Sequence, residues 1–104
     1  MKNLTPSIID SITIFSSSSR NSGSDLIHSA IFATSSDEVF ALGDNGFGQL
    51  GVGDIEERKV PEKVLPVCNK KVTFLLMRYL NACAIIQTGE LFLWGDNTYG
   101  NNDL

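Results

Sequence analysis

The sequence has few of the residues on which redox, metal or nucleic-acid chemistry depends. It contains two cysteines, one histidine and eight basic residues against 12 acidic residues, for a net charge of -4. Cys68 and Cys83 are too few for a secreted disulfide framework, and we expect both to be free, buried thiols. One histidine and two distant cysteines also fall short of the three or four ligands of a metal site. Because the basic residues are scattered, the sequence disfavours a nucleic-acid surface.

Long apolar runs are absent as well. No stretch approaches the roughly 20 apolar residues that span a bilayer. The N-terminal segment "SIIDSITIF" is interrupted by Asp10 and lacks the continuous apolar region of a signal peptide. With 104 residues, the chain has the length of one small domain. We therefore expect an intracellular, cytoplasmic or nuclear, soluble protein without a membrane partner.

What the sequence does contain is a series of short apolar runs bounded by turn residues. We expect a strand over 12–15, and an exposed loop or linker over the serine-rich stretch 16–25. The runs at 28–34 and 38–42 predict a β-hairpin, and prolines 61 and 66 predict an extended edge segment around Lys63–Val67. Further runs follow at 71–77, 82–87 and 90–94; a helix over 73–86 is an open alternative, although the turn signals favour strands.

The strongest feature is an internal repeat. Gly43-Asp44-Asn45 recurs as Gly95-Asp96-Asn97, at an offset of 52 residues. At this offset, apolar strand positions also match, as do a phenylalanine and a tyrosine in the following turn. The "KVTFL" run likewise corresponds to "SITIF". A period of this length, with a set of strands in each copy, indicates a propeller or a solenoid.

The two copies, "EVFALGDNGFGQLGVGD" and "ELFLWGDNTYG", resemble the repeat of the regulator of chromosome condensation family. The resemblance covers about residues 28–104, with a weaker extension back to residue 11, and implies part of a seven-bladed β-propeller. The positions that carry it are His28, Gly43, Asn45, Gly48, Gln49, Leu50, Gly51, Trp94, Gly95, Asn97 and Gly100. The copies depart from the family pattern at Leu42, which replaces a tryptophan. Asn81 stands where the first copy has His28, and Asn101-Asn102-Asp103 replaces a glutamine-leucine-glycine turn.

Gly46–Gly51 also matches G-x-G-x-x-G, the loop that cradles a dinucleotide pyrophosphate. Such a loop needs a helix that starts at the third glycine, whose N–H groups hold the phosphate. No helical period follows Gly51. The pattern therefore favours tight turns, in which glycines supply positive φ or a close backbone approach, and Asn45 and Asn97 supply side-chain hydrogen bonds.

Other chemistry-bearing residues favour structural roles. His28 has no triad-like context, so we interpret it as a hydrogen-bonded structural histidine between blade strands. The acidic cluster at 54–57 is interpreted as a solvated loop. We expect an inter-blade aromatic core, made of Trp94, Phe40, Phe92 and Tyr99. No catalytic, cofactor-binding or metal residue is assigned.

The sequence thus predicts an all-β fold, a partial β-propeller with about one complete four-stranded blade plus part of a second. Residues 1–27 would form an N-terminal strand and serine-rich loop, a degenerate part of the first repeat, and 28–104 two repeats, the second truncated. The resemblance implies a non-enzymatic protein–protein interaction module, with a guanine-nucleotide exchange or scaffold role toward a small GTPase or a ubiquitin-pathway protein. The alternatives are a repeat fragment without independent function and a nucleotide-binding enzyme.

Overall fold

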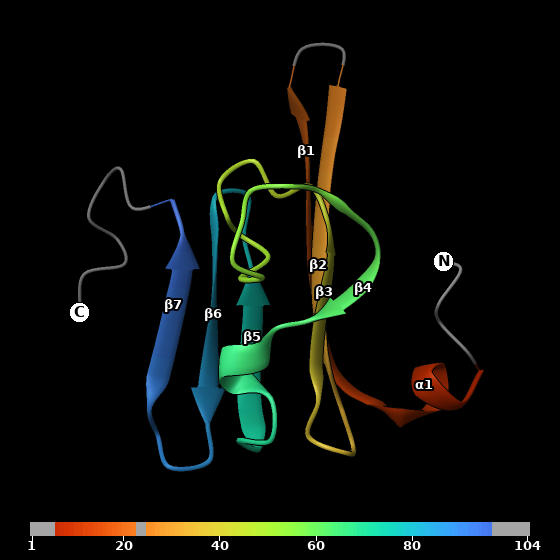
Figure 1. Ribbon diagram of the computed structural model, residues 1–104, viewed down its shortest axis with the longest axis vertical. Coiled ribbons are helices and arrows are strands. Elements are labelled where there is room, and N and C mark those ends of the chain that lie inside the picture. The colour runs from red at the N-terminus through yellow and green to blue at the C-terminus, as the bar shows by residue number, and fades with distance from the viewer. Residues whose placement is uncertain (1–5, 23–24, 97–104) are drawn as a thin grey trace.

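The chain folds into two antiparallel β-sheets, shown in Figure 1. The structure, a computed structural model, describes residues 6–22 and 25–96. The first sheet has the strand order β1-β2-β3-β4 and the second β5-β6-β7. The elements are α1 (Pro6–Ser11), β1 (Ile12–Ser22), β2 (Asp25–Thr34), β3 (Val39–Gly43), β4 (Arg58–Lys63), the 3-10 helix η1 (Leu65–Val67), β5 (Val72–Met77), β6 (Asn81–Ile86) and β7 (Leu91–Gly95). The predicted all-β fold, with one four-stranded blade and part of another, is confirmed; the short helix α1 was not predicted.

The two sheets repeat each other in register. Gly43 pairs with Ser29 in the first sheet, and Gly95 pairs with Asn81 in the second, 52 residues further along. The register makes Asn81 the counterpart of Ser29, so its sequence-based placement against His28 was wrong by one residue. Sequence comparison could not detect this error, because strand pairing fixes the register and the matching letters do not.

The first strands of the two sheets also correspond, at a larger offset. Ile14 pairs with Ala33, and Phe74, 60 residues after Ile14, pairs with Ile85. Both strands have an irregularity just before this pair. Offsets of 60 and 52 mean that the first hairpin is eight residues longer than the second.

The extra length lies in the serine-rich stretch, and the prediction of a loop over 16–25 was wrong. β1 continues to Ser22, and its pairing with β2 runs from Ser16↔Ile31 to Ser22↔Asp25. Figure 1 shows this β1–β2 ribbon projecting beyond the other strands. Composition suggested a loop, but a strand with polar side chains on both faces is stable when its backbone groups pair with a neighbour.

The segment with two prolines also differs from its prediction. The extended part is β4, which comes before the expected Lys63–Val67 segment, and residues 65–67 form η1 instead. β4 is an edge strand, so Pro61 removes no hydrogen bond from the sheet interior. Pro66 lies in the first turn of η1, where a missing N–H is tolerated.

The core lies between the two sheets. β5 of the second sheet packs against β1 and β2 of the first. The buried residues of this core are Ile31, Ala33, Val39, Ala41, Leu50, Val64, Val67, Leu75, Met77, Ala82 and Ala84. The Met77 N–H also donates to Ser16 Oγ at 2.9 Å, so one polar contact crosses the same interface. Within the described ranges, no helix is long and apolar enough to cross a membrane.

Candidate functional site

The glycine-rich loop between β3 and β4 is organised around the side chain of Asn45, which is 1% exposed. Its amide Nδ2 donates to the carbonyls of Asp54 and Glu56, each at 2.9 Å. Its Oδ1 accepts from the Leu50 N–H at 3.0 Å. One buried amide therefore holds the two halves of the loop together, in the side-chain role that the sequence suggested for it.

The backbone N–H groups of this loop are used within the loop. The Phe47 N–H donates to Gln49 Oε1 at 2.9 Å, and the Gly48 N–H to the Asn45 carbonyl at 2.9 Å. The Gly51 N–H donates to the Gly48 carbonyl at 3.2 Å. After Gly51 the chain bends through residues 52–55 and enters β4, so no helix starts there. A phosphate cradle needs inward-pointing N–H groups and a helix N-terminus, and this loop supplies neither.

The glycines differ in what they contribute. Positive φ occurs at Gly43, Gly48, Gly51, Gly53 and Gly95. At Gly43 a side chain would collide with the His28 carbonyl oxygen, and at Gly95 it would lie 2.6 Å from the Leu80 carbonyl. These are equivalent close approaches of two strands in the two blades. Gly46 has neither a positive φ nor a neighbour within 4 Å, so the general expectation that every glycine serves a turn does not extend to it.

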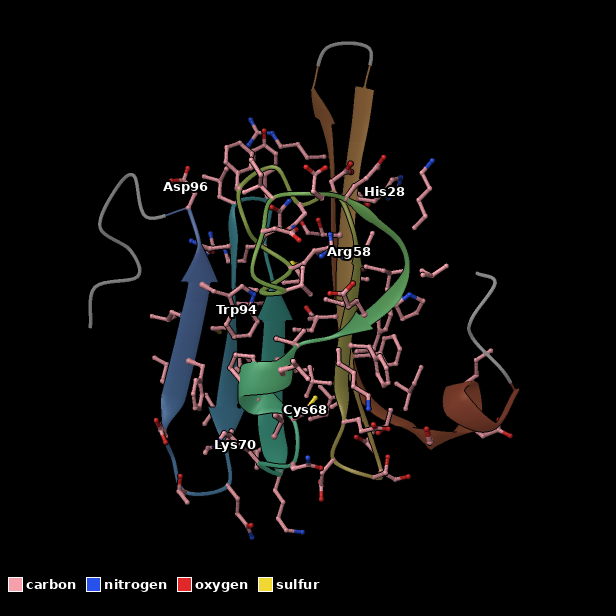
Figure 2. All side chains as sticks on the ribbon, viewed as in Figure 1. His28, Arg58, Cys68, Lys70, Trp94 and Asp96 are labelled. Carbon is pink, nitrogen blue, oxygen red and sulfur yellow. The ribbon has the colours of Figure 1, made fainter. Side chains whose placement is uncertain are left out.

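Trp94 joins the second blade to this loop. Its indole Nε1 donates to the Gln49 carbonyl at 2.8 Å, and Gly51 lies against its ring, because a Cβ at Gly51 would be 2.7 Å from Nε1. Figure 2 shows Trp94 pointing from β7 toward the centre of the molecule. Gln49 is itself fully buried, and its Nε2 donates to Ser29 Oγ at 3.3 Å. The residues of the glutamine-leucine-glycine turn thus receive the tryptophan of the next blade, and we name this contact the blade joint (Gln49, Gly51 and Trp94).

The other expected aromatic core residues are divided between locations. Phe92 packs on the core beside Trp94. Phe40 stacks on Phe32 with ring centroids 5.3 Å apart, and neither belongs to the core between the blades. The expectation for Phe40 was therefore wrong, because its side chain alternates to the other face of the first sheet. Tyr99, Asn97 and Gly100 lie outside the described residues.

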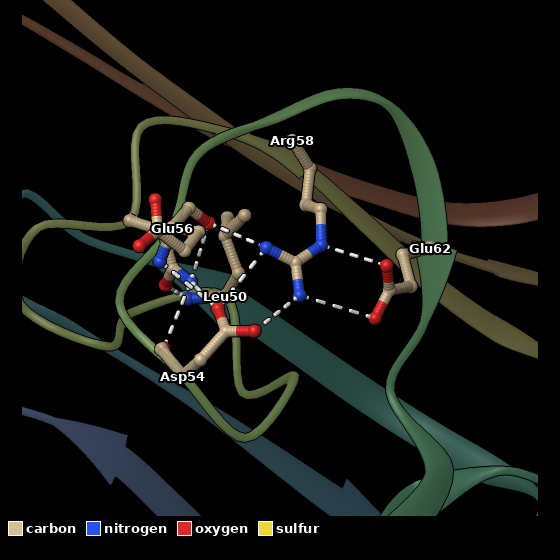
Figure 3. Close-up of polar contacts among 6 residues, drawn as sticks. Leu50, Asp54, Glu56, Arg58 and Glu62 are labelled. Atoms are coloured by element: carbon tan, nitrogen blue, oxygen red, sulfur yellow. Dashed lines mark hydrogen bonds and ion pairs between the residues drawn. The ribbon is translucent and has the colours of Figure 1, made fainter.

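Arg58 closes the loop through two carboxylates, as Figure 3 shows. Its guanidinium bonds to Asp54 Oδ2 at 2.7 Å and to Glu62 Oε1 at 2.7 Å, and also to the Glu56 carbonyl at 2.7 Å. These contacts lower the pKa of the Asp54 carboxyl and raise that of Arg58. The acidic cluster is therefore not simply solvated. Sequence reasoning missed Arg58, although the four-residue spacing of 54, 58 and 62 carried a signal.

His28 lies on β2, labelled in Figure 2, with an exposed side chain. Its Nδ1 is 3.4 Å from Ser19 Oγ of the adjoining strand, and its backbone N–H donates to Asp44 Oδ2 at 2.6 Å. It is hydrogen-bonded within the first blade, and the expectation that it sits between buried strands was wrong. Among the described residues, no three metal-ligating side chains form a cluster.

The cysteines are free but only half-buried, which corrects the expectation of buried thiols. Cys68 Sγ lies 3.3 Å from the Val39 N–H, which donates to it. Burial raises the pKa of the Cys83 thiol, and the charge of Arg78 partly offsets this rise. A thiol whose pKa is raised is a weak nucleophile, so Cys83 is suited to packing.

Two successive antiparallel sheets that pack face to face, repeat in register and are joined by a tryptophan are a pair of β-propeller blades. Residues 36–74 match the family described as "Regulator of chromosome condensation (RCC1) repeat". The chain belongs to this RCC1-repeat family.

Relatives agree with this assignment. Over 71 residues, or 67% of the chain, it is 37% identical to the X-linked retinitis pigmentosa GTPase regulator of Canis lupus familiaris. It is 33% identical over 63 residues (61% of the chain) to the RCC1 domain-containing protein RUG3, mitochondrial, and 34% identical over 64 residues (62%) to the Ultraviolet-B receptor UVR8, both of Arabidopsis thaliana. The matched segment spans 7%, 14% and 14% of the lengths of these relatives, respectively.

Proposed function

We propose that the chain is a non-enzymatic protein–protein interaction module. The observation that carries this proposal is the use of the loop's polar groups. The buried amides of Asn45 and Gln49, and the N–H groups at 47, 48, 50 and 51, all bond within the chain. The most specific motif of the sequence therefore builds a rigid corner, which supports exposed loops and strand edges that can contact a partner.

The finer role is proposed from the relatives. One relative is named as a GTPase regulator and another as an ultraviolet-B receptor, so the same repeats occur in proteins with different tasks. A small GTPase is our first candidate partner, with guanine-nucleotide exchange as the activity, and a scaffold role toward a ubiquitin-pathway protein is the alternative. Exchange displaces a nucleotide from the partner and needs no acid–base side chain in this chain.

A second candidate is a repeat unit that acts only within a larger propeller. β7 pairs on one side with β6, and no described strand pairs with its other edge. An open edge of this kind is normally covered, since its unpaired backbone groups otherwise promote aggregation. On this alternative the chain would bind no partner by itself.

The proposal is tested by placing a photo-crosslinking amino acid at exposed apolar positions on different sides of the chain, one at a time. Suitable positions are Phe47, Ile55, Leu65 and Leu91, which are 40%, 67%, 72% and 39% exposed. An interaction module should give a discrete adduct with a protein partner from positions on one side only. Adducts from no position would contradict the proposal. A rise in melting temperature with saturating nucleotide would favour the enzyme alternative instead.

The choice between exchange and scaffold needs a separate assay. The purified chain is mixed with a panel of small GTPases that carry a fluorescent guanine nucleotide, and nucleotide release is followed. Faster release from one member of the panel supports exchange. Adduct formation with a partner, but no acceleration for any GTPase, supports the scaffold role.

A further inference from the structure

One end of the molecule carries a cluster around Tyr79, in the turn between β5 and β6. The Arg20 guanidinium, from β1, lies 4.3 Å from the centroid of the Tyr79 ring. Phe47, from the glycine-rich loop, contacts the same ring edge-on at a centroid distance of 5.8 Å. Three segments that are distant in sequence therefore meet at one tyrosine. A cation–π contact also holds the guanidinium of Arg20 in a defined orientation.

Arg20 comes from the part of β1 that the second blade lacks. The first hairpin is eight residues longer than the second, and Arg20 pairs with Ile27 within this excess length. The serine-rich ribbon therefore does more than extend the sheet, because it places a cationic side chain over the turn of the neighbouring blade.

A small hollow of about 160 Å³ opens beside this cluster. It is lined by Arg20, Arg78, Tyr79, Leu80 and Asn81. The third arginine of the chain, Arg58, is held by two carboxylates, whereas neither Arg20 nor Arg78 forms an ion pair with any residue of the described segments. Both are exposed. Two unpaired guanidinium groups thus line one hollow of a chain whose net charge is -4.

Asn81 gives an independent indication of a ligand. It is 8% exposed, and its side-chain amide makes no hydrogen bond to any other described residue. Its counterpart Ser29 is satisfied, because Ser29 Oγ donates to the Asp44 carbonyl at 2.9 Å and accepts from Gln49 Nε2. A buried amide without a partner is costly, so native proteins nearly always provide one. Here the missing partner can reach Asn81 through the hollow.

We propose that this hollow, formed by Arg20, Arg78, Tyr79, Leu80 and Asn81, docks a carboxylate side chain from an acidic segment of a partner protein. The proposal rests on the interaction function above and names the surface and the chemistry of the partner. The two guanidinium groups bind the carboxylate oxygens, the Asn81 amide donates a further hydrogen bond, and the Tyr79 ring covers the methylene groups of the ligand.

A single carboxylate suits the site better than a polyphosphate chain. The hollow is small, and Asp96, whose N–H donates to the Leu80 carbonyl at 2.9 Å, brings one negative charge close to it. Two arginines and one aspartate leave a modest positive balance, which attracts a carboxylate but is too weak for the many charges of a nucleic acid.

The test uses fluorescence anisotropy with a labelled peptide of alternating glutamate and glycine, and the full 104-residue chain. The R78Q and R20Q variants should each bind at least about tenfold more weakly, because each loses a charge-assisted hydrogen bond. The matched control is K70Q, which removes one positive charge at the other end of the molecule, where Figure 2 shows Lys70 far from Asp96. K70Q should change the affinity by less than about twofold. Circular dichroism of each variant checks that it is folded.

Several results would overturn the proposal. A peptide with glutamine in place of glutamate must not bind, and equal binding would rule out carboxylate recognition. Equal losses in R78Q and K70Q would reduce the effect to net charge. Tighter binding of a phosphoserine peptide or a single-stranded DNA than of the glutamate peptide would assign the hollow to phosphate.

Asn81 provides a second readout that does not depend on charge. In a ¹⁵N-labelled sample, the side-chain amide signals of Asn81 should shift as the glutamate peptide is added, with the same midpoint as the anisotropy. No shift would contradict the proposed contact. If the peptide fails to bind while photo-crosslinks still form on another side, such as at Leu65, this inference fails and the interaction function stands.

Discussion

The indole Nε1 of Trp94 donates a hydrogen bond of 2.8 Å to the carbonyl of Gln49, 45 residues earlier in the chain. The bond links β7 of the second blade to the glycine-rich loop of the first. The same ring lies against Gly51, where any side chain would collide with it. The loop that resembles a phosphate cradle therefore functions in the structure as the seat for a tryptophan of the next blade.

The Trp94→Phe variant should be less stable by about 2 kcal/mol, because the fully buried Gln49 loses the partner of its carbonyl. Urea denaturation followed by circular dichroism measures this change. The control is Phe15→Leu, at a 60% exposed position, which should change the free energy of unfolding by less than about 0.5 kcal/mol. Equal effects of the two substitutions would mean that the indole bond contributes nothing.

The glycines provide a matched pair of substitutions. Gly43→Ala should destabilise the chain by more than about 2 kcal/mol, because its φ of 109° is strained for alanine and the new Cβ collides with the His28 carbonyl. Gly46→Ala, three residues away in an open position, should be neutral or slightly stabilising. Melting temperatures of the two variants decide the matter, and a larger loss at Gly46 would show that the loop is built differently.

Asn45→Ala should destabilise the chain by about 3 kcal/mol, since it removes three hydrogen bonds at a site that is 1% exposed. Asn45→Asp keeps the acceptor for Leu50 but loses the donor to the two carbonyls, and it should be no more stable than the alanine variant at pH 7. Equilibrium unfolding in urea measures both. An aspartate variant as stable as the wild type would disprove the donor role of the amide.

Arg58 should make stability depend on pH. Its contacts lower the pKa of the Asp54 carboxyl in the folded state. A carboxyl with a lowered pKa stabilises the fold above its ordinary pKa, near 4, and this contribution is lost as the pH falls through the lower folded value. The urea midpoint of the wild type should therefore fall below about pH 4 more steeply than that of Arg58→Gln.

Salt provides the control for this effect. These side chains are at the surface, so the difference between the wild type and Arg58→Gln should shrink as the ionic strength rises. If the two proteins have parallel pH profiles at low salt, the ion pairs in Figure 3 do not contribute to stability.

The sequence was sufficient to predict the blades because their strands are short apolar runs between strong turn signals. β3 and β7 also share a glycine-aspartate-asparagine ending, which revealed the repeat. The serine-rich strand was missed because its stability comes from pairing with β2, and composition does not report pairing. The one-residue error at Asn81 has a similar cause, since the register is set by the close approach of Gly95 to the neighbouring strand.

The residues of the candidate surfaces were harder to predict. Asn45 and Gln49 were singled out by the repeat, but their bonds depend on how the loop closes. Arg58 was missed because a charged loop has the same sequence whether its ions are paired or solvated. The contact between Arg20 and Tyr79 joins segments in different blades, and no local pattern encodes it.

The most direct test of the blade joint is a double-mutant cycle between Gly51 and Trp94. Gly51→Ala should cost about 3 kcal/mol in the wild type, from its positive φ and from the collision with the indole. In a Trp94→Leu background, where leucine is the residue at the equivalent position 42, only the strain of about 1 kcal/mol should remain. A coupling near 2 kcal/mol would establish that the loop seats the tryptophan. Additive effects within about 0.5 kcal/mol would contradict it.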